Sequence, residues 1–151
     1  MVSTQKGVTP CLKCDQTAER DVLYRDETWN VIVASYSGIP GAVQLVTRRH
    51  VEGLPNLNSK EASGLGQVLA LVAGAMIEAC GAERVYVEAF GEDVTHVHFL
   101  ILPRTPDIPM DARRGAFLAR RLEFADPEKA TAMESALRLA LNRPAQNAQR
   151  V

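Results

Sequence analysis

The sequence predicts an α+β fold in which an antiparallel sheet of about five strands packs with one long helix and a C-terminal helix. Two sets of short β-prone segments flank a long stretch of helical periodicity, which indicates strands that pair with their neighbours in the chain. A length of 151 residues and an apolar fraction of 46% suit one hydrophobic core. We expect a single domain over residues 11–142, with flexible tails at 1–10 and 144–151.

Three strands are expected before the long helix. Segments 22–25 and 29–35 are rich in β-formers and flank an Asp-Glu-Thr turn, and segment 42–47 follows a Ser-Gly-Ile-Pro-Gly breaker. The long helix should begin after Asn58, an N-cap residue with Glu61 three positions later, and end at Gly81. Its apolar positions recur with helical spacing at Leu65, Val68, Leu69, Val72 and Met76.

Two further strands and a second helix are expected after Gly81. Segment 84–90 alternates like a strand, and Gly91 then turns the chain into a strand that carries His96 and His98. We assign no structure to 105–124, which is basic and proline-rich in its first half. The last helix should open at Asp126-Pro127 and stop before Pro144.

Two of the three histidines of the chain stand two positions apart in this last strand. Side chains of a strand alternate between faces, so His96 and His98 should point the same way, about 7 Å apart. The residues between and after them are apolar and should anchor the opposite face to a core: Val97, Phe99 and Ile101. Two imidazoles on one face can hold a metal, act as a nucleophile, or do one task each.

The cysteines form a second chemical motif. Cys11-x-x-Cys14 suggests metal or redox chemistry, but it lacks the strand-to-helix setting of thioredoxin-like redox sites, which favours a metal. Cys80, just before a helix-ending glycine, is expected to be a small buried hydrophobe. The formal net charge of −1 gives no general attraction to nucleic acid or to a membrane surface. We expect a cytoplasmic protein, because the N-terminus lacks the apolar core of a signal peptide.

These residues together resemble the histidine triad (HIT) family. The likeness rests on His96-Val97-His98, which runs into Ile101-Leu102-Pro103-Arg104, and on Leu45-Val46-Thr47-Arg48-Arg49-His50. The Cys-x-x-Cys pair stands where many bacterial members carry it, and the long helix, the following strand and the Gly91-Glu92 turn come in the family's order. The resemblance covers residues 11–104 and implies a HIT-like α+β fold.

The resemblance implies a nucleotide hydrolase or nucleotidyl transferase that forms a covalent nucleotidyl-histidine intermediate. By its place in the motif, His98 would be the nucleophile, with its tautomer fixed by a backbone carbonyl. Arg104, Tyr36 and Glu92 would lie at the nucleotide. Arg48 or Arg49 could take the place of Arg104 at the phosphate, with a salt bridge as the alternative role for each arginine, and Trp29 could take the place of Tyr36 at the base, with core packing as its alternative role. The implied partners are a nucleotide or dinucleoside polyphosphate and a second copy of the chain, with no membrane and no sequence-specific nucleic acid.

The resemblance also implies a structural zinc site. Metal-binding members use the positions of Cys11, Cys14, His50 and His96, a Cys₂His₂ set that suits Zn²⁺ and leaves His98 free. A rival assignment makes both histidines of the motif ligands and leaves His50 unused. A zinc ion at the first set would fasten the N-terminal segment to the sheet.

Two positions depart from the family's pattern. Leu100 replaces the third histidine of the motif, and Ala42 replaces the histidine of a Pro-Gly-His segment, so the usual proton donor is missing. Glu92 and Asp93 also stand where members often carry glutamine and serine or threonine. Two alternatives therefore stay open: a nucleotide-binding module with weak or lost turnover, and a zinc-stabilised interaction protein.

Overall fold

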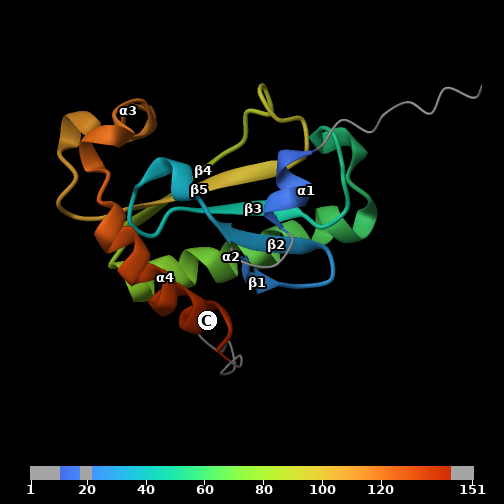
Figure 1. Ribbon diagram of the computed structural model, residues 1–151, viewed down its shortest axis with the longest axis horizontal. Helices are drawn as coiled ribbons and strands as arrows, with labels where there is room; N and C mark the ends of the chain where they lie inside the picture. The colour runs from blue at the N-terminus through green and yellow to red at the C-terminus, as the bar shows by residue number, and fades with distance from the viewer. Residues whose placement is uncertain (1–10, 18–21, 144–151) are drawn as a thin grey trace, which may run out of the picture.

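A computed structural model describes residues 11–17 and 22–143 of the chain. The tails predicted at 1–10 and 144–151 lie outside the described residues. Five strands form one antiparallel sheet in the order β1-β2-β3-β5-β4, which confirms the predicted fold class. The strands are β1 (Val22–Arg25), β2 (Trp29–Val33), β3 (Val43–Thr47), β4 (Arg84–Glu88) and β5 (His98–Arg104). β5 therefore lies between β3 and β4 (Figure 1).

The long helix α2 (Ser59–Cys80) begins and ends where the sequence predicts. The Asn58 side chain accepts a hydrogen bond from the Glu61 amide, and the Glu61 carboxylate accepts one from the Asn58 amide, which completes a capping box. Gly81 ends the helix with φ +67°. The indole of Trp29 donates to the Glu61 carbonyl and so ties the start of α2 to the sheet.

The main core lies between α2, the C-terminal helix α4 (Pro127–Leu141) and one face of the sheet. Sheet residues that point toward α2 alternate along β3 and β5, as predicted for the run that follows His96. The core residues of this layer include Val43, Leu45, Val97, Phe99 and Ile101 from the sheet side, and Val68, Val72, Met76, Leu137 and Leu141 from the helices.

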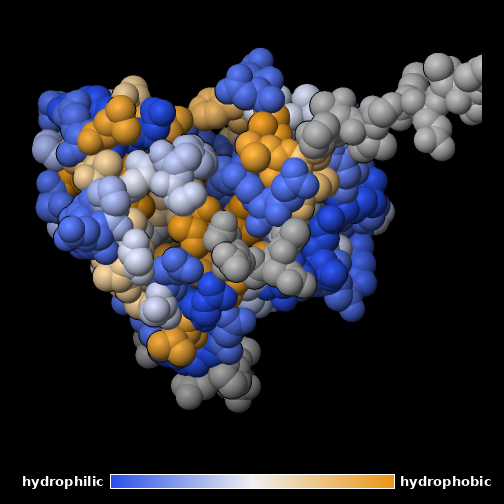
Figure 2. All heavy atoms as spheres, in the orientation of Figure 1, coloured by the Kyte–Doolittle hydropathy of each residue, from blue (hydrophilic) through white to orange (hydrophobic). Residues whose placement is uncertain are grey.

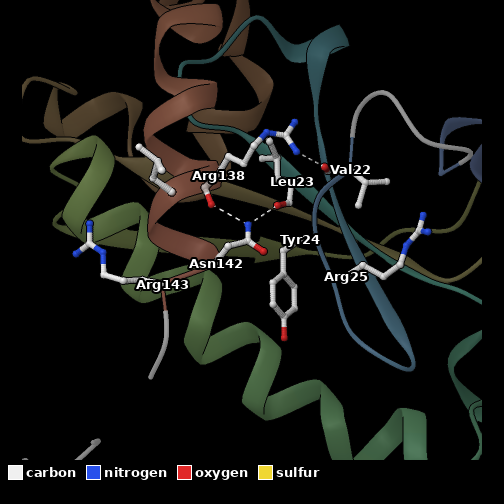
Figure 3. Close-up of a pocket in the computed structure, with 8 residues that line it drawn as sticks. Val22, Leu23, Tyr24, Arg25, Arg138, Asn142 and Arg143 are labelled. Atoms are coloured by element: carbon white, nitrogen blue, oxygen red, sulfur yellow. Dashed lines mark hydrogen bonds between the residues drawn. The ribbon is translucent and has the colours of Figure 1, made fainter. Parts of the chain in front are cut away.

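Helix α4 also covers the outer edge of β1 (Figure 3). The Arg138 guanidinium donates to the Val22 carbonyl and the Asn142 amide donates to the Leu23 carbonyl, so edge groups of the sheet are satisfied by side chains. A hollow of about 900 Å³ opens here, and the guanidinium of Arg138 that lines it is held by this bond and by Glu134. None of the predicted site residues lines this hollow.

The opposite face of the sheet carries the short helix α1 (Leu12–Gln16) at one end and the segment after β5 at the other (Figure 1). That segment forms η3 (Met110–Ala112), α3 (Gly115–Ala119) and η4 (Arg121–Phe124), where the sequence assigned no structure. Its apolar residues form a second core cluster with Leu100 and Leu102 of β5. Figure 2 shows that hydrophilic atoms cover most of this face, with apolar atoms in separate patches.

By length and hydropathy, α2 is the one helix in residues 11–17 and 22–143 that could cross a membrane, with 22 residues and a window of mean hydropathy 1.5. One face of α2 packs against the sheet and α4, and 28% of that window is buried.

The predicted elements differ from the observed ones mainly at their ends. β2 stops at Val33, and the next residues form the 3₁₀ helix η1 (Ser35–Ser37), because the chain must turn into the Gly-Ile-Pro-Gly breaker. β5 begins at His98 rather than before His96. His96 instead makes an isolated bridge with Glu52, because β3 ends at Thr47 and the chain returns to the same edge only after a turn. The 3₁₀ helix η2 (Leu54–Asn56) follows that bridge.

Candidate metal centre and nucleophile

Three separate segments bring four metal-binding side chains together. The donor atoms of Cys11, Cys14, His50 and His96 all lie within 4.8 Å of one another. The two cysteines stand at the start of α1, His50 follows β3, and His96 precedes β5. Sulfur-to-nitrogen distances are 3.3 Å for Cys11–His96, 3.5 Å for Cys14–His50 and 3.6 Å for Cys14–His96. The Cys₂His₂ set is therefore assembled in space as the sequence predicts.

Both histidines of the cluster turn the same ring nitrogen toward the sulfur atoms. Nε2 of His96 donates to the Thr47 carbonyl at 2.9 Å, so in the neutral ring Nδ1 carries the free lone pair. Nε2 of His50 lies 3.3 Å from a carboxylate oxygen of Glu52, which holds that ring in the same tautomer. Partners of this kind fix the orientation of metal-binding imidazoles.

The dimensions of the cluster fit a tetrahedral ion. Zinc bonds of roughly 2.0–2.3 Å to nitrogen and sulfur give a tetrahedron with edges of roughly 3.3–3.8 Å. The three sulfur-to-nitrogen distances, 3.3, 3.5 and 3.6 Å, fall within that range. Thiolate and imidazole are also the donors that zinc prefers. The residues present therefore fit a zinc ion in size and in chemistry.

The surroundings of Cys11 and His96 favour the protonation states in which these two side chains can bind a metal. Burial alone would raise the pKa of the Cys11 thiol, but hydrogen bonds from Cys14, Lys13 and His50 lower it overall. Burial lowers the pKa of His96, against the opposing effect of its bond to Thr47, and so keeps the ring neutral. A thiolate and a neutral imidazole are the protonation states that bind metal.

His98 stands outside this cluster and is held differently. Its Nδ1 donates to the backbone carbonyl of His96 at 2.7 Å, so the lone pair of the neutral ring lies on Nε2. Burial lowers the pKa of His98, and the nearby charge of Lys13 lowers it further, against the effect of the bond to His96. The side chain is half-buried, and no cysteine of the described segments contacts its ring.

A hollow of about 440 Å³ lies beside His98. It is bounded by the segment after His50, by the loop that follows β4, and by the approach to β5 with His98 at its start. Glu52, Leu54 and Phe90 line it together with both histidines of the motif. A hollow of this size is in the range of small-molecule sites.

The other three predicted site residues, Tyr36, Glu92 and Arg104, lie on three different segments. Tyr36 is 56% exposed on η1, and its hydroxyl accepts a hydrogen bond from the Gln44 amide. Glu92 is exposed in the loop that follows Gly91. Arg104 stands at the opposite end of β5, about 20 Å along the strand, where it is buried and paired with Glu83. The structure does not bring Arg104 together with His98.

The two departures from the family's pattern belong to one apolar cluster. Leu100 and Ala42 both belong to the second core cluster, which the aromatic rings of Phe117 and Phe124 close from the C-terminal segment. Apolar packing therefore fills the positions where the pattern has two imidazoles.

Several residues of this region were missed in the sequence. Lys13, between the two cysteines, is 3% exposed and donates to the side-chain oxygens of Gln16 and Gln44 at 2.9 and 2.7 Å. Thr47 and Glu52 form hydrogen bonds with the two histidines of the Cys₂His₂ cluster. Glu52 follows His50 by two positions and could have been found from that spacing, whereas the other contacts join residues far apart in the chain.

Comparison with known proteins places this architecture among histidine triad structures. A zinc-bound histidine triad family protein from Mycobacterium smegmatis matches with a TM-score of 0.64 and 20% identity, over 87% of this chain and 92% of that chain. A Hit-like protein from Bartonella henselae involved in cell-cycle regulation matches with a TM-score of 0.61 and 19% identity, over 80% and 87%. A uridylyltransferase matches with a TM-score of 0.58 and 22% identity, over 84% of this chain and 45% of that chain.

No family model and no curated protein matches the sequence. At these identities the structural likeness establishes the fold, which is the histidine triad fold that the sequence predicts.

Proposed function

We propose that this chain is a zinc-binding histidine triad protein that hydrolyses or transfers a nucleotidyl group, with His98 as the nucleophile. The observation that carries the proposal is the difference between two neighbouring imidazoles. His96 turns its free nitrogen to the cysteines, whereas His98 is locked through Nδ1 and keeps Nε2 outside the metal cluster. Solved structures of the same fold include a protein described as zinc-bound and others described as uridylyltransferases.

The proposed reaction has two steps. Nε2 of neutral His98 attacks the α-phosphorus, and the bond to the leaving group breaks with its electron pair on that group. Water or another acceptor then attacks phosphorus, and the phosphorus–nitrogen bond breaks with its electron pair on Nε2. The bond from Nδ1 to the His96 carbonyl persists through both steps and stabilises the positive ring of the intermediate.

The proposed zinc ion is structural. It would be held by Cys11, Cys14, His50 and His96, and its contribution is to fasten α1 to the sheet. The exposure of Cys14 and His50 at the surface gives the ion an entry path.

Further parts of the proposal follow from the fold and the resemblance. The partner is a nucleotide or dinucleoside polyphosphate, bound near Tyr36 and Glu92. Arg104 could act on the nucleotide only from the far end of β5, and its ion pair with Glu83 favours a structural role for this arginine. We also propose one domain over 11–142, a homodimer and a cytoplasmic location.

A second candidate is a nucleotide-binding module without turnover. The observation that favours it is the apolar packing around Leu100 and Ala42, which removes two imidazoles from the site. General acid help is commonly worth about 10²–10⁴ in rate, so its loss would leave slow chemistry at most unless another group replaces it.

The test is to trap the intermediate. The zinc-loaded protein is incubated with a diadenosine polyphosphate or adenosine phosphoramidate labelled in the adenosine, quenched in base and mapped by mass spectrometry. We expect an adenylyl group on His98 and none in His98→Ala, whose thermal unfolding is compared with that of the wild type. Nucleotide binding without an adduct or turnover would establish the module, and an absence of nucleotide binding by calorimetry would leave the zinc-stabilised interaction protein.

A further inference from the structure

The sheet places one unexplained acid next to Leu100. In the antiparallel register, Gln44 of β3 and Glu88 of β4 both pair with Leu100 of β5. Directly paired residues of neighbouring strands point to the same face, so these three side chains form a row across the sheet. His98 shares this face because it stands two positions before Leu100. The row therefore lies beside the proposed nucleophile.

Glu88 differs from Gln44, the other polar side chain of the row, because one of its carboxyl oxygens is buried without a hydrogen-bond partner. Its Oε2 is enclosed and accepts no hydrogen bond from any residue in 11–17 or 22–143. By contrast, both ends of the Gln44 amide have partners, since its oxygen accepts from Lys13 and its nitrogen donates to the Tyr36 hydroxyl. An enclosed carboxyl oxygen without a partner is costly in a fold, and such groups often mark functional sites.

Within residues 11–17 and 22–143, no cationic side chain forms an ion pair with Glu88. Burial raises the pKa of the Tyr36 phenol on η1, the hydrogen bond from Gln44 and the charge of Arg121 on η4 oppose that rise, and the charge of Glu88 adds a smaller upward effect. Burial raises the pKa of Glu88 itself, and no charged group counters that effect. The environment thus favours the protonated carboxyl, which is the form that can donate.

Building on the function proposed above, we infer that Glu88 is the general acid of this site and replaces the imidazole missing at Leu100. Diagonal neighbours in an antiparallel pair stand roughly 7–8 Å apart, so Glu88 can reach a leaving atom on a phosphorus bound to His98, although not the ring itself. Ala89 and Phe90, the two residues after Glu88, line the same hollow as His98.

The proton balance is complete without another reactant. As Nε2 of His98 bonds to phosphorus and the bond to the leaving atom breaks, the Glu88 carboxyl gives its proton to that atom and becomes a carboxylate. In the second step the carboxylate takes a proton from the attacking water while the phosphorus–nitrogen bond breaks. The products are the nucleotide and the protonated leaving group, and both side chains return to their starting states.

The experiment compares two adenylyl substrates that differ in leaving-group basicity. Adenosine 5′-(4-nitrophenyl phosphate) releases a weakly basic phenolate that departs without a proton, whereas the phenyl ester releases a more basic one that needs it. We expect Glu88→Gln to slow the phenyl ester by about 10²–10⁴-fold and the nitrophenyl ester by less than about 10-fold. Glu128→Gln, which removes the same charge from an exposed position on α4, should change neither rate.

Chemical rescue separates a proton donor from a structural role. Formate should restore turnover of the phenyl ester by Glu88→Ala in a concentration-dependent manner, which loss of packing would not allow. Equal slowing of both esters by Glu88→Gln, or no rescue of a folded Glu88→Ala, overturns the inference while leaving His98 as nucleophile. If wild-type protein turns over neither ester, the proposed function and the inference fail together.

Discussion

The turn before β3 gives a prediction whose size can be worked from the structure. Gly41 has φ +80°, and a Cβ built on it would lie 2.5 Å from the sulfur of Cys80. Gly41→Ala therefore carries two costs. A left-handed conformation costs a residue with a Cβ about 1–2 kcal/mol, and an overpacked contact costs about 1–3 kcal/mol. We expect a total of about 2–5 kcal/mol lost from the free energy of unfolding.

Two further variants separate these costs. Gly81 has φ +67°, and a Cβ added there would meet nothing within 4 Å, so Gly81→Ala should show the conformational cost alone. Cys80→Ala removes the sulfur that Gly41→Ala meets, so the double variant should recover about 1–3 kcal/mol relative to additivity. The Pro103 Cγ, 3.1 Å from the same Cβ, makes this recovery incomplete.

The assay is denaturant unfolding at 25 °C with linear extrapolation to water for the wild type, the three single variants and the double variant. The reasoning is refuted if Gly41→Ala costs the same with cysteine and with alanine at position 80, because the close approach would then contribute nothing. The result matters for the site because this turn starts β3, whose pairing with β5 sets the position of His98.

Two other predictions concern the metal centre and the acid limit of stability. His50→Ala should lower the zinc bound per chain, measured by elemental analysis after dialysis, and expose α1 to proteolysis; unchanged zinc would exclude His50 as a ligand. The Arg49 guanidinium holds the pKa of the Glu61 carboxyl in the folded protein below its ordinary value of 4.5. The ionised Glu61 carboxylate therefore stabilises the fold at a pH above 4.5, and this stabilisation is lost as the pH falls from 4.5 through the lower pKa of the folded state. Glu61→Gln should therefore narrow the difference in denaturation midpoint between pH 7 and pH 3, and an undiminished difference would contradict this.

Local signals were sufficient to predict most of the elements. Asn58, Glu61 and Gly81 mark the ends of α2 because capping depends on residues within a turn of one another. Pro127 after Asp126 marks the start of α4 for the same reason. The segment after β5 could not be assigned, because its short helices are held by tertiary contacts such as Phe117 with Tyr86 rather than by their own periodicity.

Only those residues of the candidate site that belong to a motif of known spacing could be predicted from the sequence. The four proposed metal ligands were identified in the sequence because they match a known pattern, and the structure brings their donor atoms together. Glu88 carried no signal, since its relation to Leu100 comes from the pairing of β4 with β5. Lys13 was missed because its burial depends on Gln44, which is 31 positions away in the chain.

The two histidines of the motif depend on each other through the backbone. The ring of His96 is fixed from outside the motif, by the Thr47 carbonyl at the end of β3. Its own carbonyl in turn accepts the Nδ1 proton of His98, so the residue that faces the cysteines also sets the tautomer of the proposed nucleophile. A shift of the His96 backbone would move one side chain of the Cys₂His₂ cluster and the lone pair on Nε2 of His98 together. Zinc at this cluster would therefore orient the proposed nucleophile without touching it, because it would fix the backbone carbonyl that accepts the Nδ1 proton of His98.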